Sequence, residues 1–154
     1  MSLKLNTTLV DDWRVNYLEF DNGKLVVKKL ILGEIINSVP GKKAKPKILP
    51  WKQKITESVF KAKLIHGLKS NSIYAISLSF KFHPKYHTMH KSDVDNYVKP
   101  VMDGIAAGLF STDPLNVTKF NFDDSNFKHL LIEKLDNPLN PSDEGVAIVV
   151  GMAN

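Results

Sequence analysis

The chain has 154 residues, 43% of them hydrophobic and 24% charged, which fits a single folded domain with a core of its own. It contains no cysteine, which excludes disulfides, thiolate metal sites and a cysteine nucleophile, and no apolar run approaches the roughly 18 residues of a membrane helix. The formal net charge is +5, and every basic residue except Arg14 is a lysine, which suits contact with the phosphates of a polyanion better than base reading.

The first 29 residues are predicted to be an extension, and residues 30–154 are predicted to form the main domain. Two β-prone runs, 13–20 and 24–28, flank the sequence Asp21-Asn22-Gly23. A turn of this composition between two short strands is typical of a hairpin. The pattern therefore predicts an N-terminal β-hairpin.

The rest of the chain mixes strands with about two helices. Apolar residues at helical spacing predict one helix over residues 51–66, which stops at Gly67, and another over 97–110. Alternation over 76–82 predicts a strand with one apolar and one polar face, and the apolar run 146–150 predicts a central strand buried on both faces. Together these elements indicate an α+β fold, a small mixed β-sheet with about two helices packed on one face. Further strands are expected over 30–36, 117–122 and 128–135, with loops over 39–50, 83–92 and 136–145.

Two acids, Asp93 and Asp95, lie two residues apart just before the second predicted helix. Because Asn96 is a good N-cap residue and Pro100 is tolerated best in a first helical turn, we expect the segment before Asn96 to be extended. Residues i and i+2 of an extended segment face the same side, which would place both carboxylates near the positive end of the helix. Such a pair suits a hard divalent cation and, in a basic protein, favours phosphodiester hydrolysis.

Lys99 falls in the first turn of the predicted helix, where its charge opposes the helix dipole. A local rule broken in this way favours a functional role, such as holding a scissile phosphate. Asp103 follows one turn later on the same face and could orient Lys99. The structural alternative is that Asp95 or Asn96 caps the helix, and that Asp95, Lys99 and Asp103 form a solvated stripe of ion pairs.

The acidic motif resembles the signature of the RusA family of Holliday junction resolvases, which is carried here by Asp93, Asp95, Asn96, Lys99, Asp103 and, ten residues later, Asp113. The sequence Gly-Leu-Phe at 108–110 and the lysine-rich loop at 39–47 are also similar to the family, and the likeness spans residues 30–122. It implies a small homodimeric endonuclease of bacteria, phages or prophages that depends on Mg²⁺, with Mn²⁺ as the alternative metal. Such an enzyme makes paired symmetric nicks in four-way DNA junctions during recombination and repair.

The resemblance also implies a role for each residue of the pattern. The metal would be held by Asp93, Asp95 and Asp113, and Lys99 would stabilise charge on the phosphate. The supporting residues would be Asn96 and Asp103.

The chain departs from the family at the last acid. A second aspartate is usual at that point, whereas Pro114 follows Asp113 here. Either Asp113 takes the role by a small shift in register, or cleavage is weakened, or the acids Asp123 and Asp124 are recruited instead.

Lysines are densest around Trp51, and we expect this cluster to contact a DNA backbone with the Trp51 ring near an unstacked base. The alternative is a solvated loop with Trp51 in the core. A second group, His83, His87 and His90, has spacings that suit zinc only on a helix, and Pro84 favours a loop there. The lysines expected to bind DNA are Lys42, Lys43, Lys45, Lys47, Lys52, Lys54 and Lys91.

The sequence therefore predicts a metal-dependent endonuclease that resolves Holliday junctions. The N-terminus lacks the pattern of a signal peptide, so we expect a cytoplasmic protein with no membrane partner. Two alternatives stay open: a junction-binding or nucleic-acid-binding module on the same fold with weakened or lost cleavage, and an unrelated basic interaction protein.

Overall fold

The computed structural model describes residues 2–38, 45–87 and 94–154. Its main sheet has four strands in the order β3-β6-β4-β5. Central strand β6 is antiparallel to both neighbours, whereas β4 and edge strand β5 are parallel, so the sheet is mixed. The strands of this sheet are β3 (Lys24–Leu32), β4 (Tyr74–Lys81), β5 (Phe127–Lys134) and β6 (Gly145–Met152).

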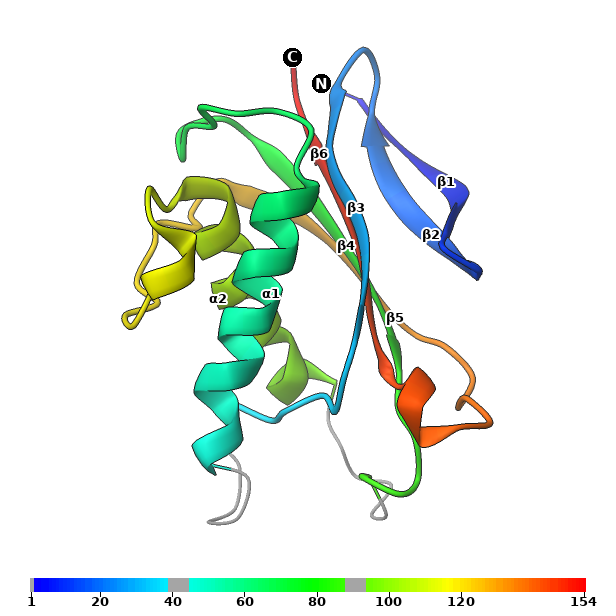
Figure 1. Ribbon diagram of the computed structural model, residues 1–154. Helices are drawn as coiled ribbons and strands as arrows, with labels where there is room; N and C mark the ends of the chain where they lie inside the picture. The colour runs from blue at the N-terminus through cyan, green and yellow to red at the C-terminus, as the bar shows by residue number, and fades with distance from the viewer. Residues whose placement is uncertain (1, 39–44, 88–93) are drawn as a thin grey trace.

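Two helices, α1 (Ile48–Ala62) and α2 (Asp95–Phe110), cover one face of the sheet, and a hairpin lies against the other face (Figure 1). The hairpin is made of β1 (Leu3–Val10) and β2 (Trp13–Phe20). The predicted α+β fold, with two helices on one face of a small mixed sheet and an N-terminal hairpin, is confirmed.

Strand β6 is buried on both faces, as its continuous apolar run predicts. Val146, Ile148 and Val150 belong to the core beneath the helices. Ala147 and Val149 point the other way and pack in a second cluster with hairpin residues such as Trp13. This two-sided burial follows from the alternation of side chains along a strand that is covered on both sides.

Strand β4 has the predicted apolar and polar faces, but its polar face is not exposed to solvent. Ile76, Leu78 and Phe80 lie in the helix-side core. Ser77 and Ser79 face the hairpin and are each only 2% exposed. The amide of Leu18 in β2 donates a hydrogen bond of 2.8 Å to the Ser77 hydroxyl, which satisfies a buried polar group.

The strands of the N-terminal region pair differently from the prediction. Residues 13–20 and 24–28 are indeed strands, but β2 pairs with β1 and β3 pairs with β6. The turn at Asn22, which has a φ of 57°, carries the chain from the hairpin into the main sheet. The predicted boundary between residues 29 and 30 falls inside β3. A turn sequence shows where the chain reverses, but burial of Val27 and Ile31 in the core selects the partner of β3.

Two further boundaries differ from expectation. Residues 117–122 do not form the expected strand. This segment lies along α1 instead, where the Gln53 amide donates to the Val117 carbonyl and the Lys52 Nζ lies 5.2 Å from the centre of the Phe120 ring. Helix α1 begins three residues earlier than predicted, at Ile48, because Pro50 fits a first helical turn, where amides have no partner. It also ends earlier than the predicted stop at Gly67, at Ala62, because Lys63 is already extended.

Lys63, just after α1, holds the last turn of α2. Its Nζ lies 3.3 Å from the carbonyl oxygens of both Gly108 and Leu109, which have no helical partners at the end of α2. Burial lowers the pKa of this ammonium.

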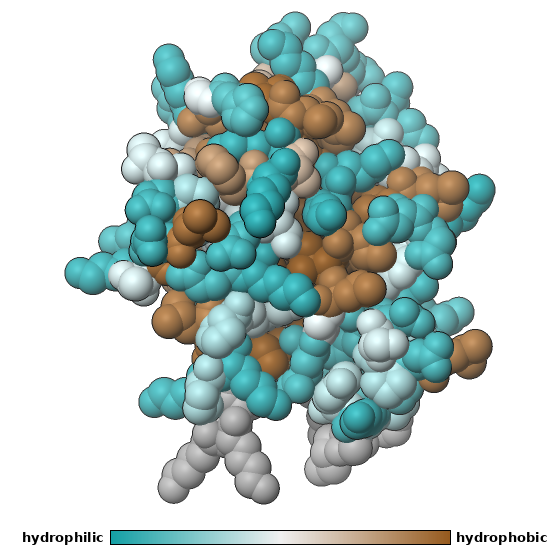
Figure 2. Space-filling model, in the orientation of Figure 1, coloured by the Kyte–Doolittle hydropathy of each residue, from teal (hydrophilic) through white to brown (hydrophobic). Residues whose placement is uncertain are grey.

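On the face that carries α1, hydrophobic residues are interspersed with hydrophilic ones (Figure 2). Among the residues described, neither helix is both long and apolar enough to span a membrane.

Candidate functional site

The acidic motif lies at the start of α2, but the helix begins earlier than expected. Asp95 is already helical, and Val94 before it has helical dihedrals (φ −54°, ψ −32°). The expected extended approach to Asn96 is therefore wrong for residues 94–95, and Asn96 is not an N-cap. Asp93 lies outside the described residues.

Pro100 explains why the expectation failed. It is the sixth residue of α2, where the missing amide leaves the Asn96 carbonyl without its helical donor. The Ser38 amide, from the loop after β3, donates to that carbonyl at 2.7 Å. A tertiary hydrogen bond thus replaces the lost helical one, so the helix can extend a full turn before the proline.

Lys99 and Asp103 form the expected pair on one face of α2. The Lys99 Nζ lies 3.1 Å from one carboxylate oxygen of Asp103, and the Lys52 Nζ of α1 lies 3.1 Å from the other. The Asp103 side chain is largely buried, whereas the Lys99 side chain is 71% exposed. Asp103 is therefore held by Lys52 and in turn steadies Lys99, whose remaining donors face solvent.

An open groove between α2 and β5 has the motif on its wall. Asp95 and Lys99 line it together with Asp124, from the segment that leads into β5. Neither Asp95 nor Asp124 has a side-chain hydrogen bond or ion pair with another described residue, so both carboxylates are available to a ligand. The remaining lining residues are apolar: Val98, Met102, Phe127, Leu130 and Ile132.

Asp113 lies elsewhere. Helix α2 has 16 residues and is thus about 24 Å long. Asp95 is its first residue, whereas Asp113 follows its last turn and does not line the groove. Both Asp113 carboxylate oxygens accept hydrogen bonds from the Asn116 amide, at 3.2 and 3.0 Å. The structure therefore brings Asp124, the less favoured candidate, into the groove in place of Asp113.

The donor set of the groove is chemically suited to a hard cation, because carboxylate oxygens are the ligands that Mg²⁺ and Mn²⁺ prefer. Within residues 2–38, 45–87 and 94–154, no three acidic or histidine side chains come together as a metal site. Asp95 and Asp124 are the acidic residues among the described lining of the groove, and the predicted ligand Asp93 is outside these ranges.

The predicted DNA-binding lysines are only partly available. The Lys47 Nζ lies 3.2 Å from Glu34, Lys52 is paired with Asp103, and Lys54 donates to the Leu32 carbonyl. Lys45 is exposed. Lys42, Lys43 and Lys91 lie outside the described residues.

Trp51 does not flank a base-binding surface. The residue is 5% exposed and belongs to the helix-side core, so the expectation that its ring lies near an unstacked base is wrong. A tryptophan at this position of α1 faces the sheet together with Ile55 and Val59, which lie one and two turns further along the helix.

A buried carboxylate that sequence reasoning missed lies beneath the start of α2. Glu144, just before β6, is fully buried and accepts hydrogen bonds from the backbone amides of Ile35 at 2.7 Å and His83 at 2.6 Å. The His87 Nε2 lies 2.9 Å from the same carboxylate. His87 is thus part of a hydrogen-bond network, and His90 is outside the described residues. A single glutamate in a polar loop carries no local signal of burial.

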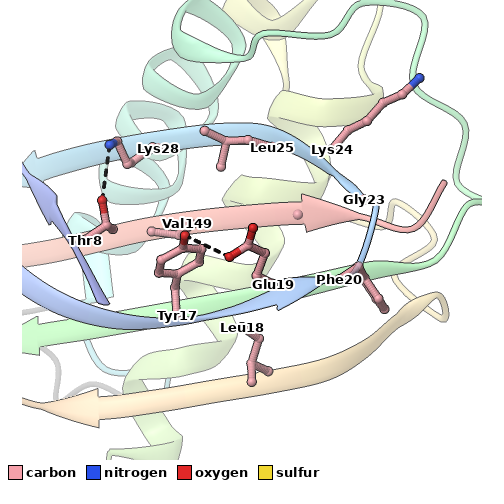
Figure 3. Close-up of a pocket in the computed structure, with 11 residues that line it drawn as sticks. Thr8, Tyr17, Leu18, Glu19, Phe20, Gly23, Lys24, Leu25, Lys28 and Val149 are labelled. Carbon is pink, nitrogen blue, oxygen red and sulfur yellow. Dashed lines mark hydrogen bonds between the residues drawn. The ribbon is translucent and has the colours of Figure 1, made fainter. Parts of the chain in front are cut away.

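A second hollow lies on the opposite face of the sheet, between the hairpin and strands β3 and β6 (Figure 3). Tyr17 and Glu19, two residues apart on β2, both line it, with 3.2 Å between the phenol oxygen and the carboxylate. Burial and the charge of Glu19 raise the pKa of the Tyr17 phenol. Because the sheet separates this hollow from α2, it is distinct from the groove of the acidic motif.

No protein-family model, curated protein or solved structure matches this chain. We therefore infer function from the geometry of the groove and from the sequence pattern of the acidic motif.

Proposed function

We propose that the protein is a metal-dependent endodeoxyribonuclease that resolves four-way DNA junctions by paired phosphodiester cleavage. The observation that carries the proposal is the placement of Asp95 and Lys99, one helical turn apart, on the wall of a groove that Asp124 also lines. The Lys99 ammonium can bind a phosphodiester, and the Asp95 and Asp124 carboxylates can bind the metal that its cleavage requires.

Each described residue has a defined task in this proposal. Asp95 and Asp124 would hold Mg²⁺ or Mn²⁺, together with Asp93 as the family resemblance implies. Held there, such a metal would supply an activated water for attack on phosphorus and stabilisation of the leaving oxygen. The exposed Lys99 ammonium binds the phosphate and stabilises the charge that develops on it.

The surrounding residues keep Lys99 in place. Lys52 neutralises one oxygen of the Asp103 carboxylate, and the other oxygen accepts a hydrogen bond from Lys99. An aspartate shared in this way limits the directions that the Lys99 ammonium can take.

A net charge of +5 favours association with DNA through its phosphates, which predicts strong salt dependence of binding. A two-fold dimer, acting in the cytoplasm, would match two symmetric cuts in a two-fold substrate.

A second candidate is a junction-binding module that has lost efficient cleavage. It is favoured by one observation: Asp113 is occupied by Asn116 and lies beyond the far end of α2 from Asp95. If the metal requires Asp113, the groove has too few ligands for catalysis.

A synthetic four-way junction in Mg²⁺ separates the candidates. We compare the parent with Asp95→Asn and Lys99→Ala, and use Asp12→Asn and Lys4→Ala in the hairpin as controls with the same change of charge. Paired nicks that both site variants lose and both controls keep support the nuclease. Tight junction binding by the parent without nicks supports the binding module. Equal affinity for junction and linear duplex contradicts both and leaves an unrelated basic interaction protein.

A further inference from the structure

The buried Glu144 carboxylate joins parts of the chain that are distant in sequence. It accepts a hydrogen bond from the backbone amide of Ile35, in the loop after β3. It accepts another from the backbone amide of His83, two residues after the end of β4. Glu144 immediately precedes β6, and its backbone carbonyl accepts a hydrogen bond of 2.9 Å from the amide of Gly33. Two amide hydrogen bonds to one fully buried carboxylate, together with this backbone contact, give Glu144 a fixed position, because no water competes for its oxygens.

His87 extends this fixed point toward α2. Its Nε2 lies 2.9 Å from the Glu144 carboxylate, and its Nδ1 lies 3.3 Å from the Tyr97 hydroxyl. The imidazole is packed edge-on against two rings, with centroid distances of 5.0 Å to Phe82 and 5.4 Å to Tyr97. The two polar contacts and the two ring contacts of His87 together determine one orientation of its side chain.

Tyr97 is in the first turn of α2, two residues after Asp95 and two before Lys99. We propose that Glu144, His87 and Tyr97 act as positioning residues that fix the first turn of α2, and with it Asp95 and Lys99, to the adjacent ends of the central strands β4 and β6. The catalytic consequence rests on the nuclease function proposed above. None of the three touches the substrate.

We call the chain of contacts from Glu144 through His87 to Tyr97 the relay. Its hydrogen-bond chemistry supports a fixed structural link rather than a pH-dependent one. A carboxylate only accepts, so the His87 Nε2 donates to Glu144. With neutral imidazole, the Tyr97 hydroxyl donates to Nδ1; with imidazolium, the same hydroxyl oxygen accepts from Nδ1. The chain of contacts is therefore complete in both protonation states of His87.

Three variants test the relay through kinetics on a four-way junction. Tyr97→Phe keeps the ring and removes the hydroxyl. His87→Gln keeps an N–H near the Nε2 position and has no atom at the Nδ1 position. Each is expected to lower kcat about tenfold or more, with KM unchanged, because small displacements of reacting groups cost rate rather than affinity. The double variant is expected to match either single one, since both break the same contact.

Tyr17→Phe is the matched control, because it removes a hydroxyl bonded to a carboxylate on the opposite face of the sheet. Its kcat should equal that of the parent. Effects of Tyr97→Phe and His87→Gln that multiply in the double variant would overturn the relay, as would a Tyr97→Phe enzyme with the parent's kcat.

Amide hydrogen exchange tests the relay without relying on activity. In α2 the amides of Lys99 and Val101 donate to the carbonyls of Asp95 and Tyr97, so they report fraying of the first turn. We expect faster exchange at these two amides in Tyr97→Phe and His87→Gln, and parent rates in Tyr17→Phe. Unchanged exchange overturns the positioning proposal. A parent that does not cut junctions, but shows the expected exchange pattern, contradicts the nuclease function and leaves the positioning of the first turn supported.

Discussion

Gly104 of α2 packs directly on Ile55 of α1, so closely that a Cβ at position 104 would lie 2.7 Å from the Ile55 Cβ. Gly108 makes the same approach to Val59, one turn further along both helices. The residue numbers rise together, so the two helices run parallel. This close contact is what lets Lys52 of α1 reach Asp103 of α2 and so support Lys99.

Gly104→Ala should therefore destabilise the protein. The added methyl group meets both a β-branched side chain and the Lys52 carbonyl, and overpacking of this kind costs about 1–3 kcal/mol, more than the gain of up to about 1 kcal/mol in helix propensity. The measurement is the free energy of unfolding from urea denaturation. Gly151→Ala in β6 is the control, because its Cβ would have ordinary contacts of 3.7 and 3.8 Å. Equal stability of the two variants would show that the helices separate easily.

Glu144→Gln should lower stability by about 1–3 kcal/mol. In either orientation the new NH₂ group faces a backbone amide donor, from Ile35 or from His83, so a buried donor loses its acceptor. The exposed neighbour Asp143 provides the control, and Asp143→Asn should stay within about 0.5 kcal/mol of the parent. If urea denaturation gives Glu144→Gln an equally small change in the free energy of unfolding, the hydrogen bonds of this carboxylate contribute little to folding.

Lys99→Ala should abolish cleavage without loss of stability. The exposed Lys99–Asp103 pair contributes about 0.3–0.5 kcal/mol, whereas a cation in the first turn of a helix costs about 0.3–1 kcal/mol through the helix dipole. Asp103 keeps Lys52 as a partner after the change. Thermal unfolding should thus show an unchanged or slightly raised Tm. A marked fall in Tm would assign Lys99 a structural role and remove the reason to call its position functional.

Asp124 and Asp113 compete for the role of the last acid. If the groove is the metal site, Asp124→Asn raises the Mg²⁺ concentration for half-maximal cleavage at least about tenfold, the lower bound for loss of even an indirect metal contact. Asp113→Asn should have little effect, because an amide oxygen can still accept from Asn116. Titration of Mg²⁺ against the initial rate distinguishes them. The reverse order would restore Asp113 to the role that the family resemblance implies.

The sequence predicted those elements whose pattern is local. The apolar run of β6, the alternation of β4 and the inward face of α2 all lie where the periodicity places them, because burial on one side or two leaves a direct trace in hydrophobicity. The pairing of Lys99 with Asp103 was also predictable, since residues four apart on a helix are neighbours.

What failed depends on contacts between distant residues. The sequence predicts too late a start for α2 because the donor that compensates for Pro100 is the amide of Ser38, which no local rule connects to Asn96. Strand β3 pairs with β6 rather than β2 for a similar reason, and Asp124 enters the groove only through the path of the chain along α1. A segment's partners in space are decided by the whole core.

The measurement that tests the central claim most directly maps nicks on a four-way junction labelled at the 5′ end of each strand in turn, with Mg²⁺ and with chelator. We expect nicks at two positions related by the two-fold axis of the junction, dependent on Mg²⁺ and lost in Asp95→Asn, whose carboxylate lines the groove. A parent protein that leaves all four strands intact in Mg²⁺, or an Asp95→Asn protein that cuts as fast as the parent, would contradict the claim.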